Sequence, residues 1–309
     1  MSILVDESTR IIIQGITGRE AATMTRDIMD YGGRVVGGVT PGRGGRDVHG
    51  VPVFDTVRQI TARERVDASI LAVPAGFVRD AAFEAIEAGV PLLVILTERI
   101  PRRDVVQILE LAHLRGSRVI GPNTMGLISP GKTKVGSVGG PAVDTRKSFV
   151  PGRVGIMSRS GGMTTELANL LTQSGLGQST AISMGGDPII GSTFVELLPL
   201  WEADPETEAV VIFCEPGGPM EADLAEKVTK EGTRLPIVAF IAGHFAAEMP
   251  GVRFGHAGSM VEGKADTAEE KARLMREAGI LVAEDFSQIP ALVKEAIGRE
   301  VGPRPEAQG

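Results

Sequence analysis

Short apolar runs alternate with longer amphipathic stretches through the first 120 residues. Each apolar run has the length of a buried strand, and each stretch between two runs is long enough for a helix. The predicted strands are Ile11–Gln14, Arg34–Val39, Ala68–Val73, Leu92–Leu96 and Arg118–Ile120. The predicted helices are Arg19–Asp30, Gly76–Ala88 and Arg103–Arg115. Strands that alternate with helices in this way predict a parallel, doubly wound sheet.

The same alternation returns after a stretch of irregular sequence. Residues 129–152 are rich in Gly, Pro, Lys and Ser and have no clear period, which is typical of a connection between domains. Beyond this stretch, strands are predicted at Val154–Met157, Ser179–Met184, Ala209–Cys214, Ile237–Ile241 and near Ile280–Val282. Helices are predicted to begin near Gly162, Ser192, Met220, Thr267 and Ser287, and Thr267 with Glu270 fits a capping box. We therefore expect an α/β protein with domains at residues 1–128 and 153–298, followed by a flexible tail at 299–309.

Composition and charge exclude several classes of protein. With 309 residues, of which 42% are hydrophobic and 23% charged, the chain can bury more than one core. The net charge of −7 argues against a nucleic-acid-binding surface. The only cysteine, Cys214, lies in an apolar run, so it is predicted to be a buried structural thiol, and a cysteine-rich metal site is excluded. No apolar run approaches the ~20 residues of a membrane span. A cytoplasmic enzyme with no metal site in this chain is the expectation.

A glycine-rich turn follows the first predicted strand. Gly15-Ile16-Thr17-Gly18 leads into a helix, whose N-terminus offers free N–H groups and a positive dipole to an anion. The spacing is not G-x-G-x-x-G, and no acidic residue follows the second strand to hold a ribose. Instead, Arg43 lies among glycines in the next loop, which suits a phosphate or a phosphorylated ribose. The two loops together predict a phosphate-rich nucleotide ligand, although glycines at such places can also simply close tight turns.

Two later loops should line the same crevice, because ligands of open α/β sheets bind beyond the carboxyl ends of the strands. These loops are Val73–Gly76 and Leu96-Thr97-Glu98. Thr97 and Glu98 fit equally well as an N-cap and a first-turn acid of the next helix. Their position at the predicted sheet edge is what makes them candidates.

His256 has the most distinctive setting among the four histidines. It stands between Gly255 and the pair Ala257-Gly258, so the backbone can bend and the imidazole can project. A core histidine more often lies within a periodic apolar element. By itself, His256 would be interpreted as a solvent-exposed loop residue. His244 precedes it in the same region and is a candidate for a supporting role.

Two further segments favour a chemical role for His256. Residues Ser158–Glu166 follow a strand and start a helix, and their serines and glycines present N–H and O–H donors to a tetrahedral anion. Glu215 follows the strand that ends at Cys214, where its carboxylate could hold one imidazole N–H and leave the other ring nitrogen free to attack phosphorus. Glu215 alone could also be a turn residue. The histidine, the orienting acid and the anion-binding helix start together indicate a phosphohistidine enzyme.

In their order and spacing, these motifs resemble the alpha subunit of succinate–CoA ligase (succinyl-CoA synthetase) and the related portion of ATP-citrate lyase. The likeness covers nearly the whole chain. The matching segments are Met1–Val5, Gly15–Gly18, Val36–Gly42, Gly121–Asn123, Ser158–Gly161, Gly185–Pro188, Asp204–Ala209 and Gly255–Gly258. The resemblance implies an N-terminal Rossmann-like CoA-binding domain and a C-terminal flavodoxin-like ligase domain.

The resemblance also implies roles for individual residues. His256 matches the phosphorylated histidine and Glu215 its partner acid. Arg43 stands where the family usually has a lysine, which keeps the positive charge. The positions that match coenzyme A contacts are Thr17, Gly18, Arg19, Glu20, Arg43, Leu96, Thr97 and Glu98. The positions expected to bind the acid or phosphate are Asn123, Ser160, Gly161, Gly162 and Thr165.

Some positions depart from the succinate pattern. Gly162-Met163-Thr164-Thr165 replaces Thr-Leu-Thr-Tyr, so that Thr165 stands where a tyrosine is expected to contact the acid. The Gly-Gly-Met form is more similar to ATP-citrate lyase. Thr124-Met125 replaces Cys-Pro after Pro-Asn, and Glu215-Pro216 replaces Glu-Ile before Gly-Gly. A dicarboxylate such as succinate or malate ranks first as the acid, a tricarboxylate such as citrate second, and other small acids stay open.

Members of this family work with a beta subunit that carries an ATP-grasp nucleotide site. Nothing in this chain resembles that site or a Walker P-loop. The resemblance therefore implies a partner that binds ATP or GTP with Mg²⁺, in an αβ or α2β2 hetero-oligomer. Two alternatives remain from the residues: an NAD(P)-dependent oxidoreductase, and a non-catalytic CoA-binding regulatory protein. The oxidoreductase alternative lacks the G-x-G-x-x-G motif and the acidic residue that would hold a ribose. The regulatory-protein alternative gives no role to His256, Glu215 and Ser160.

Overall fold

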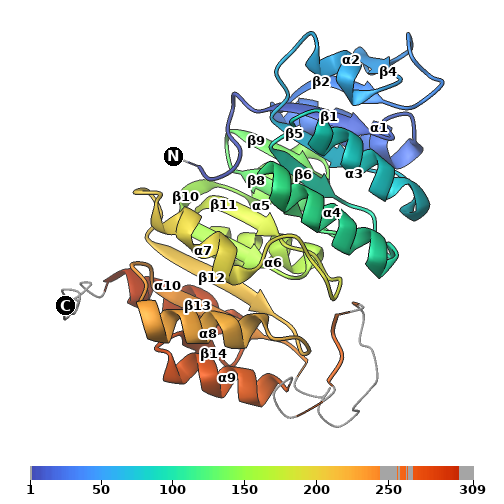
Figure 1. The fold of residues 1–309 in the computed structure, drawn as a ribbon. Coiled ribbons are helices and arrows are strands. Elements are labelled where there is room, and N and C mark those ends of the chain that lie inside the picture. Colours follow the sequence, from blue (N-terminus) through green and yellow to red (C-terminus); the bar gives the residue numbers. More distant parts are fainter. Residues whose placement is uncertain (1, 244–255, 257, 262, 264–266, 299–309) are drawn as a thin grey trace, which may run out of the picture.

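The computed structural model describes residues 2–243, 256, 258–261, 263 and 267–298. These residues form two α/β units, which Figure 1 shows stacked, the first in blue to green and the second in green through yellow to red. The predicted tail at 299–309 and His244 lie outside the described residues. In the part of the chain that is described, no helix is both long enough and apolar enough to cross a membrane.

The first unit is built on a seven-stranded sheet with the order β3-β4-β2-β1-β5-β6-β7. Its strands are β1 (Arg10–Gln14), β2 (Arg34–Val39), β3 (Asp47–Val48), β4 (Val51–Phe54), β5 (Ala68–Leu71), β6 (Leu92–Ile95) and β7 (Arg118–Ile120). Its helices are α1 (Arg19–Tyr31), α2 (Val57–Thr61), the 3-10 turn η1 (Ala75–Phe77), α3 (Val78–Glu87) and α4 (Arg102–Arg115). All strands except the edge strand β3 run parallel. Without β3, the strand order is 3-2-1-4-5-6, which is that of the Rossmann fold.

The second unit has a sheet with the order β14-β13-β12-β10-β11-β8-β9. Its strands are β8 (Gly126–Ser129), β9 (Thr133–Gly136), β10 (Pro151–Ser158), β11 (Gln178–Ser183), β12 (Ala209–Cys214), β13 (Ile237–Ile241) and β14 (Leu281–Ala283). Its helices are α5 (Ala142–Ser148), α6 (Gly161–Gln173), α7 (Phe194–Glu202), α8 (Met220–Glu231), α9 (Ala268–Glu277), η4 (Phe286–Gln288) and α10 (Ile289–Gly298). From β10 to β14 the strands are parallel in the order 2-1-3-4-5, as in flavodoxin. The predicted fold class is confirmed.

The stretch 129–152, predicted as a connection, contains regular structure. It includes strand β9, helix α5 and the start of β10. Strands β8 and β9 form an antiparallel hairpin, and β8 pairs with β11, so the hairpin extends the second sheet. Strands of four residues with glycines show too few positions for a hydrophobic period to be visible. The domain boundaries stay a prediction.

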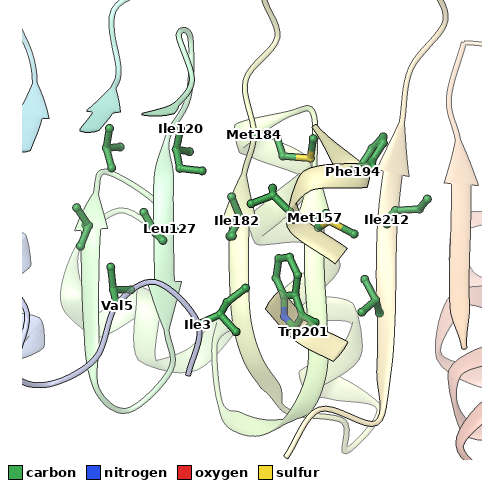
Figure 2. Packing of buried hydrophobic residues seen from close by; sticks show 14 of the residues in the cluster. Ile3, Val5, Ile120, Leu127, Met157, Ile182, Met184, Phe194, Trp201 and Ile212 are labelled. Atoms are coloured by element: carbon green, nitrogen blue, oxygen red, sulfur yellow. The ribbon is translucent and has the colours of Figure 1, made fainter. Parts of the chain in front are cut away.

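Apolar side chains alternate between the two faces of the strands and form the cores. Ile12 of β1 packs with α2, α3 and α4, whereas its neighbours Ile11 and Ile13 face α1. The cluster that contains Ile11 continues into the second unit. Figure 2 shows Leu127 from β8 and Met157 from β10 in this cluster. The two units therefore share one continuous apolar core.

The helix start predicted at Thr267 and the burial predicted for Cys214 are confirmed. The Thr267 hydroxyl accepts a hydrogen bond from the Glu270 N–H at 3.3 Å and caps the start of α9. Cys214 is fully buried, and this burial raises the pKa of its thiol well above the ordinary value. The thiol is therefore structural.

Candidate active site

Each sheet reverses its strand order at one point, and the site residues gather at these two points. In the first sheet the reversal lies between β1 and β5, where the turn at Gly15 meets the loop after Leu71. Gly15 has φ of +85°, and a Cβ atom there would lie 2.4 Å from the Ala72 carbonyl oxygen. Only glycine fits this conformation and this close approach. The crevice at such a reversal is the usual ligand site of open α/β sheets.

Two adjoining cavities of about 700 and 610 Å³ open at this crevice. They share Gly18 and the loop Ala72–Pro74. The larger cavity is lined by the predicted CoA residues Gly18, Arg19, Glu20, Leu96, Thr97 and Glu98, and the smaller one by Thr17 and Gly18. A pair of cavities of this size, next to the N-terminus of α1, fits a long ligand that carries phosphates.

Arg43 is exposed on the loop that follows β2. Its loop is held by Asp55, whose Oδ1 accepts hydrogen bonds from the N–H groups of Gly42 and Gly44 at 2.7 and 3.0 Å. The loop approaches the α1 turn through Thr40, whose hydroxyl lies 3.2 Å from that of Thr17. Arg43 therefore lies on a braced loop beside the cavities, within the same unit as the other predicted CoA residues.

In the second sheet, Glu215 and His256 come together at the reversal between β10 and β12. The Nδ1 atom of His256 lies 2.9 Å from both carboxylate oxygens of Glu215, which follows β12 directly. Ser259 donates its hydroxyl to Glu215 Oε2 at 2.7 Å. The His256 side chain is 28% exposed, and its Nε2 makes no hydrogen bond to any described residue. Sequence reasoning missed Ser259, although its place three residues after His256 is a signal that could have found it.

Hydrogen bonding sets the protonation states of this pair. The bond to Glu215 raises the pKa of His256, while burial and the charge of Arg159 act in the opposite direction. Burial alone would raise the pKa of Glu215, but the hydrogen bonds from His256 and Ser259 outweigh it and lower that pKa. Glu215 is therefore a carboxylate at neutral pH and holds Nδ1–H. When the ring is neutral, Nε2 is the nitrogen that carries the lone pair.

The N-terminus of α6 is the second part of this site. Ser160 caps the helix, and its hydroxyl accepts a hydrogen bond from the Met163 N–H at 3.4 Å. A Cβ atom on Gly161 would lie 2.0 Å from Met125, which lines the larger cavity, so the helix start packs directly against that cavity wall. Gly162 is exposed with open space beside it, and Thr165 follows in the same helix, half-buried. The free N–H groups of this first turn can receive an anion.

A path of backbone hydrogen bonds joins the two parts of the site. The Asn123 N–H donates to the Thr97 carbonyl at 3.0 Å, and the Gly186 N–H donates to the Asn123 carbonyl at 3.2 Å. The Gly258 N–H donates to the Gly186 carbonyl at 3.1 Å. A Cβ atom on Gly186 would lie 2.4 Å from the His256 ring, so the imidazole packs on this glycine. The structure thus brings the predicted CoA loop and the predicted phosphohistidine loop to one place.

Asp187 is another residue that sequence reasoning left without a role. It is buried, and its Oδ1 accepts a hydrogen bond from the Asn123 side-chain amide at 3.0 Å. Burial raises the pKa of its carboxyl group. The motif Gly185–Pro188 belongs to the family resemblance, but the contact of Asp187 with Asn123 depends on the fold. Among the residues that the structure describes, no cluster of three or more His, Cys, Asp or Glu side chains is placed to hold a metal ion.

Comparison with known proteins identifies the family. Residues 6–99 match the CoA binding domain family, and residues 157–281 match the CoA-ligase family. Alpha subunit 1 of the ADP-forming succinate–CoA ligase from Archaeoglobus fulgidus is 45% identical, over 96% of this chain and 99% of that protein. This chain belongs to the succinate–CoA ligase alpha-subunit family. The predicted class of enzyme, an acid–CoA ligase, is confirmed, and the oxidoreductase alternative is wrong.

The family extends beyond succinate and shares its fold with larger enzymes. The alpha subunit of malate–CoA ligase from Methylorubrum extorquens is 41% identical, over 97% of this chain and 99% of that protein. The solved structure of ATP citrate lyase from Methanosaeta concilii, in complex with (3S)-citryl-CoA, has a TM-score of 0.87 at 23% identity. It is matched over 96% of this chain, which spans only half of that longer chain. At this identity the likeness shows the fold alone.

Proposed function

We propose that this chain is the CoA-binding, phosphohistidine-carrying subunit of an NDP-forming ligase for a small carboxylic acid. The observation that carries the proposal is the geometry of His256. Its Nδ1 is held at 2.9 Å by Glu215, its Nε2 makes no hydrogen bond within the described part of the chain, and its ring packs on Gly186. The Gly186 N–H donates a hydrogen bond to the Asn123 carbonyl oxygen. The Asn123 N–H donates one to the carbonyl oxygen of Thr97, which lines the larger cavity. A nucleophilic nitrogen thus lies beside the place where a thioester would form.

The reaction would run in three balanced steps. Nε2 of His256 takes the terminal phosphoryl group of the nucleotide, and the bond to the nucleoside diphosphate breaks. A carboxylate oxygen of the acid then takes the phosphoryl group from Nε2, which restores the imidazole and forms an acyl phosphate. Reaction of the acyl phosphate with the CoA thiol forms the thioester and releases phosphate and the thiol proton. Glu215 stabilises the positive charge that the ring acquires in the first step.

A partner is part of this proposal. The relatives are named as alpha subunits, and the sequence contains neither a Walker P-loop nor a segment that resembles an ATP-grasp site. We therefore assign ATP or GTP, with Mg²⁺, to an ATP-grasp beta subunit in an αβ or α2β2 hetero-oligomer of the cytoplasm. In this arrangement, His256 passes the phosphoryl group from the partner's nucleotide site to the N-terminus of α6.

For the acid we propose a dicarboxylate bound at the start of α6, with citrate as the second candidate. Relatives named for succinate and for malate are 45% and 41% identical, so identity does not select between these acids. Gly162 has open space beside it, and Thr165 supplies less bulk than the tyrosine expected from the succinate pattern. The additional room suits an acid with a hydroxyl or a further carboxylate. Succinate and malate therefore stay together as the first candidates for the acid.

The test is a screen of acids with the reconstituted complex. The chain is co-expressed with the beta subunit from the same genome, and CoA thioester formation is measured with ATP or GTP. We expect a thioester with succinate or malate, and incorporation of one labelled phosphoryl group into the chain. Absence of both signals with every acid would refute the ligase proposal and favour the CoA-binding regulatory protein.

Removing the charge of Arg43 tests the placement of CoA. With Arg43→Ala, the KM for CoA is expected to rise about 10-fold with little change in kcat, because a charge-assisted contact to phosphate is lost from an exposed loop. Comparing CoA with dephospho-CoA locates the contact: a penalty confined to CoA assigns Arg43 to the 3′-phosphate, and an equal penalty assigns it to the pyrophosphate. Arg58→Ala on α2 removes another exposed arginine and is the matched control. An unchanged KM for both ligands would contradict the assignment.

A further inference from the structure

Two buried cations converge on the loop that carries Glu215, here called the Glu215 loop (residues 215–218). Lys271 is 1% exposed and donates its Nζ to the carbonyl oxygen of Gly217 at 2.8 Å and to that of Glu215 at 3.0 Å. Arg159 is 2% exposed and donates Nη1 to the same Gly217 oxygen at 3.1 Å. A carbonyl oxygen accepts two hydrogen bonds, and here both come from positive charges.

The two cations reach the loop from different elements. Arg159 directly precedes Ser160, the cap of α6, so it belongs to the segment that starts the anion-binding helix. Lys271 lies in α9 and also pairs with Glu221 of α8, with Nζ and Oε2 2.7 Å apart and both side chains buried. The Glu215 loop is therefore tied to the starts of three helices, α6, α8 and α9.

The Glu215 loop and Arg159 both pack against Gly258, two residues after His256. A Cβ atom on Gly217 would lie 2.5 Å from the Gly258 carbonyl oxygen, so the Glu215 loop packs directly against the segment after His256. A Cβ atom on Gly258 would lie 2.6 Å from Nη2 of Arg159. A shift of Gly217 would therefore move Glu215 relative to the imidazole that it holds.

This network is costly for a purely structural core. Within the described part of the chain, Arg159 Nε and Glu221 Oε1 are buried and have no hydrogen-bond partner. Buried charges that are only partly satisfied destabilise a fold relative to apolar residues of similar size. Such groups are expected where a position must be held for chemistry.

We propose that Arg159 and Lys271 are positioning residues for phosphoryl transfer, which hold the Glu215 loop through Gly217 so that the carboxylate meets His256. This inference rests on the proposed function. Neither cation needs to touch the nucleotide, the acid or CoA. Their role is to keep the relation between Glu215 and His256 fixed while the charge on the imidazole changes.

The test separates positioning from stability by removing the ion pair in two stages. Lys271→Met alone leaves Glu221 buried without its partner and is expected to lower the unfolding midpoint by roughly 10 °C. Lys271→Met combined with Glu221→Leu removes both charges and is expected to restore most of that loss. The first-order rate of His256 phosphorylation by ATP is then measured in the complex with the beta subunit. In the double variant we expect this rate to stay about 10- to 100-fold below wild type, with an unchanged KM for CoA.

Helix α8, which carries Glu221, also offers a matched control. Lys227 and Glu231 form an ion pair at the surface of α8, and Lys227→Met with Glu231→Leu removes it without a contact to the Glu215 loop. This control is expected to phosphorylate at the wild-type rate. Arg159→Lys is the second test variant: it keeps a positive charge but loses the planar donor geometry, and we expect a fall of about 10-fold in the rate.

The outcomes distinguish the two proposals. If wild type is phosphorylated and the Lys271→Met/Glu221→Leu variant, with restored stability, is within about twofold of it, Lys271 is structural only and the inference is overturned. Should that double variant fail to fold, an unchanged rate in Arg159→Lys overturns the inference in the same way. If wild type itself takes up no phosphoryl group, the proposed function fails first.

Discussion

Replacing His256 with asparagine is expected to abolish phosphorylation of the chain and to lower ligase activity by at least ~10⁴-fold. The side-chain amide of asparagine can still donate a hydrogen bond to Glu215, as Nδ1 of histidine does. It has no nucleophilic nitrogen in place of Nε2. Binding of CoA should be unaffected, because His256 does not line either of the two cavities. The measurement is incorporation of labelled phosphate from ATP, together with CoA affinity by titration.

The control for this substitution is His113→Asn, which removes an exposed histidine near the end of α4. It should leave both labelling and turnover at wild-type levels. Persistent labelling of the His256→Asn variant, at one phosphoryl group per chain, would show that another residue carries the phosphate. The mechanism through Nε2 would then have to be abandoned.

Replacing Glu215 with glutamine is expected to lower the rate of phosphorylation by about 10³-fold. Glutamine keeps the size of the side chain, but its amide can donate to Nδ1 as well as accept from it. Donation to Nδ1 places the ring proton on Nε2, which blocks the atom that must attack phosphorus. The loss of the negative charge also removes the stabilisation of the phosphorylated ring. Single-turnover phosphorylation measures the combined effect, and a rate within about tenfold of wild type would contradict the assigned role.

The pH dependence provides a second signature of Glu215. In the wild type the bond to Glu215 raises the pKa of His256, so phosphorylation falls as the pH drops through this raised value and the ring becomes protonated. In Glu215→Gln the pKa of His256 should fall, and the acidic limb of the rate profile should move to lower pH while the plateau decreases. Glu226→Gln, which removes an exposed carboxylate of α8, is the control. An acidic limb that stays in place would show that Glu215 does not set the protonation of the ring.

Local patterns predicted much of the fold. The apolar runs located β1, β2, β6, β12 and β13 to within a residue or two, because buried parallel strands are apolar on both faces. The β8–β9 hairpin and α5 were missed because they are short. The hairpin owes its place to the pairing of β8 with β11 rather than to a hydrophobic period of its own.

The sequence by itself determined the fold class and the family, and it singled out His256 and Glu215 as candidates, because these predictions depend on local periodicity and on motifs of adjacent residues. Only the tertiary structure decided that these two side chains meet, since 41 positions separate them along the chain. It also decided that Lys271 and Glu221 are buried and that Ser259 holds the carboxylate. A charged residue on an amphipathic helix is ordinarily predicted to face water. Which charges are instead enclosed depends on how the helices pack against one another, and that is a property of distant contacts.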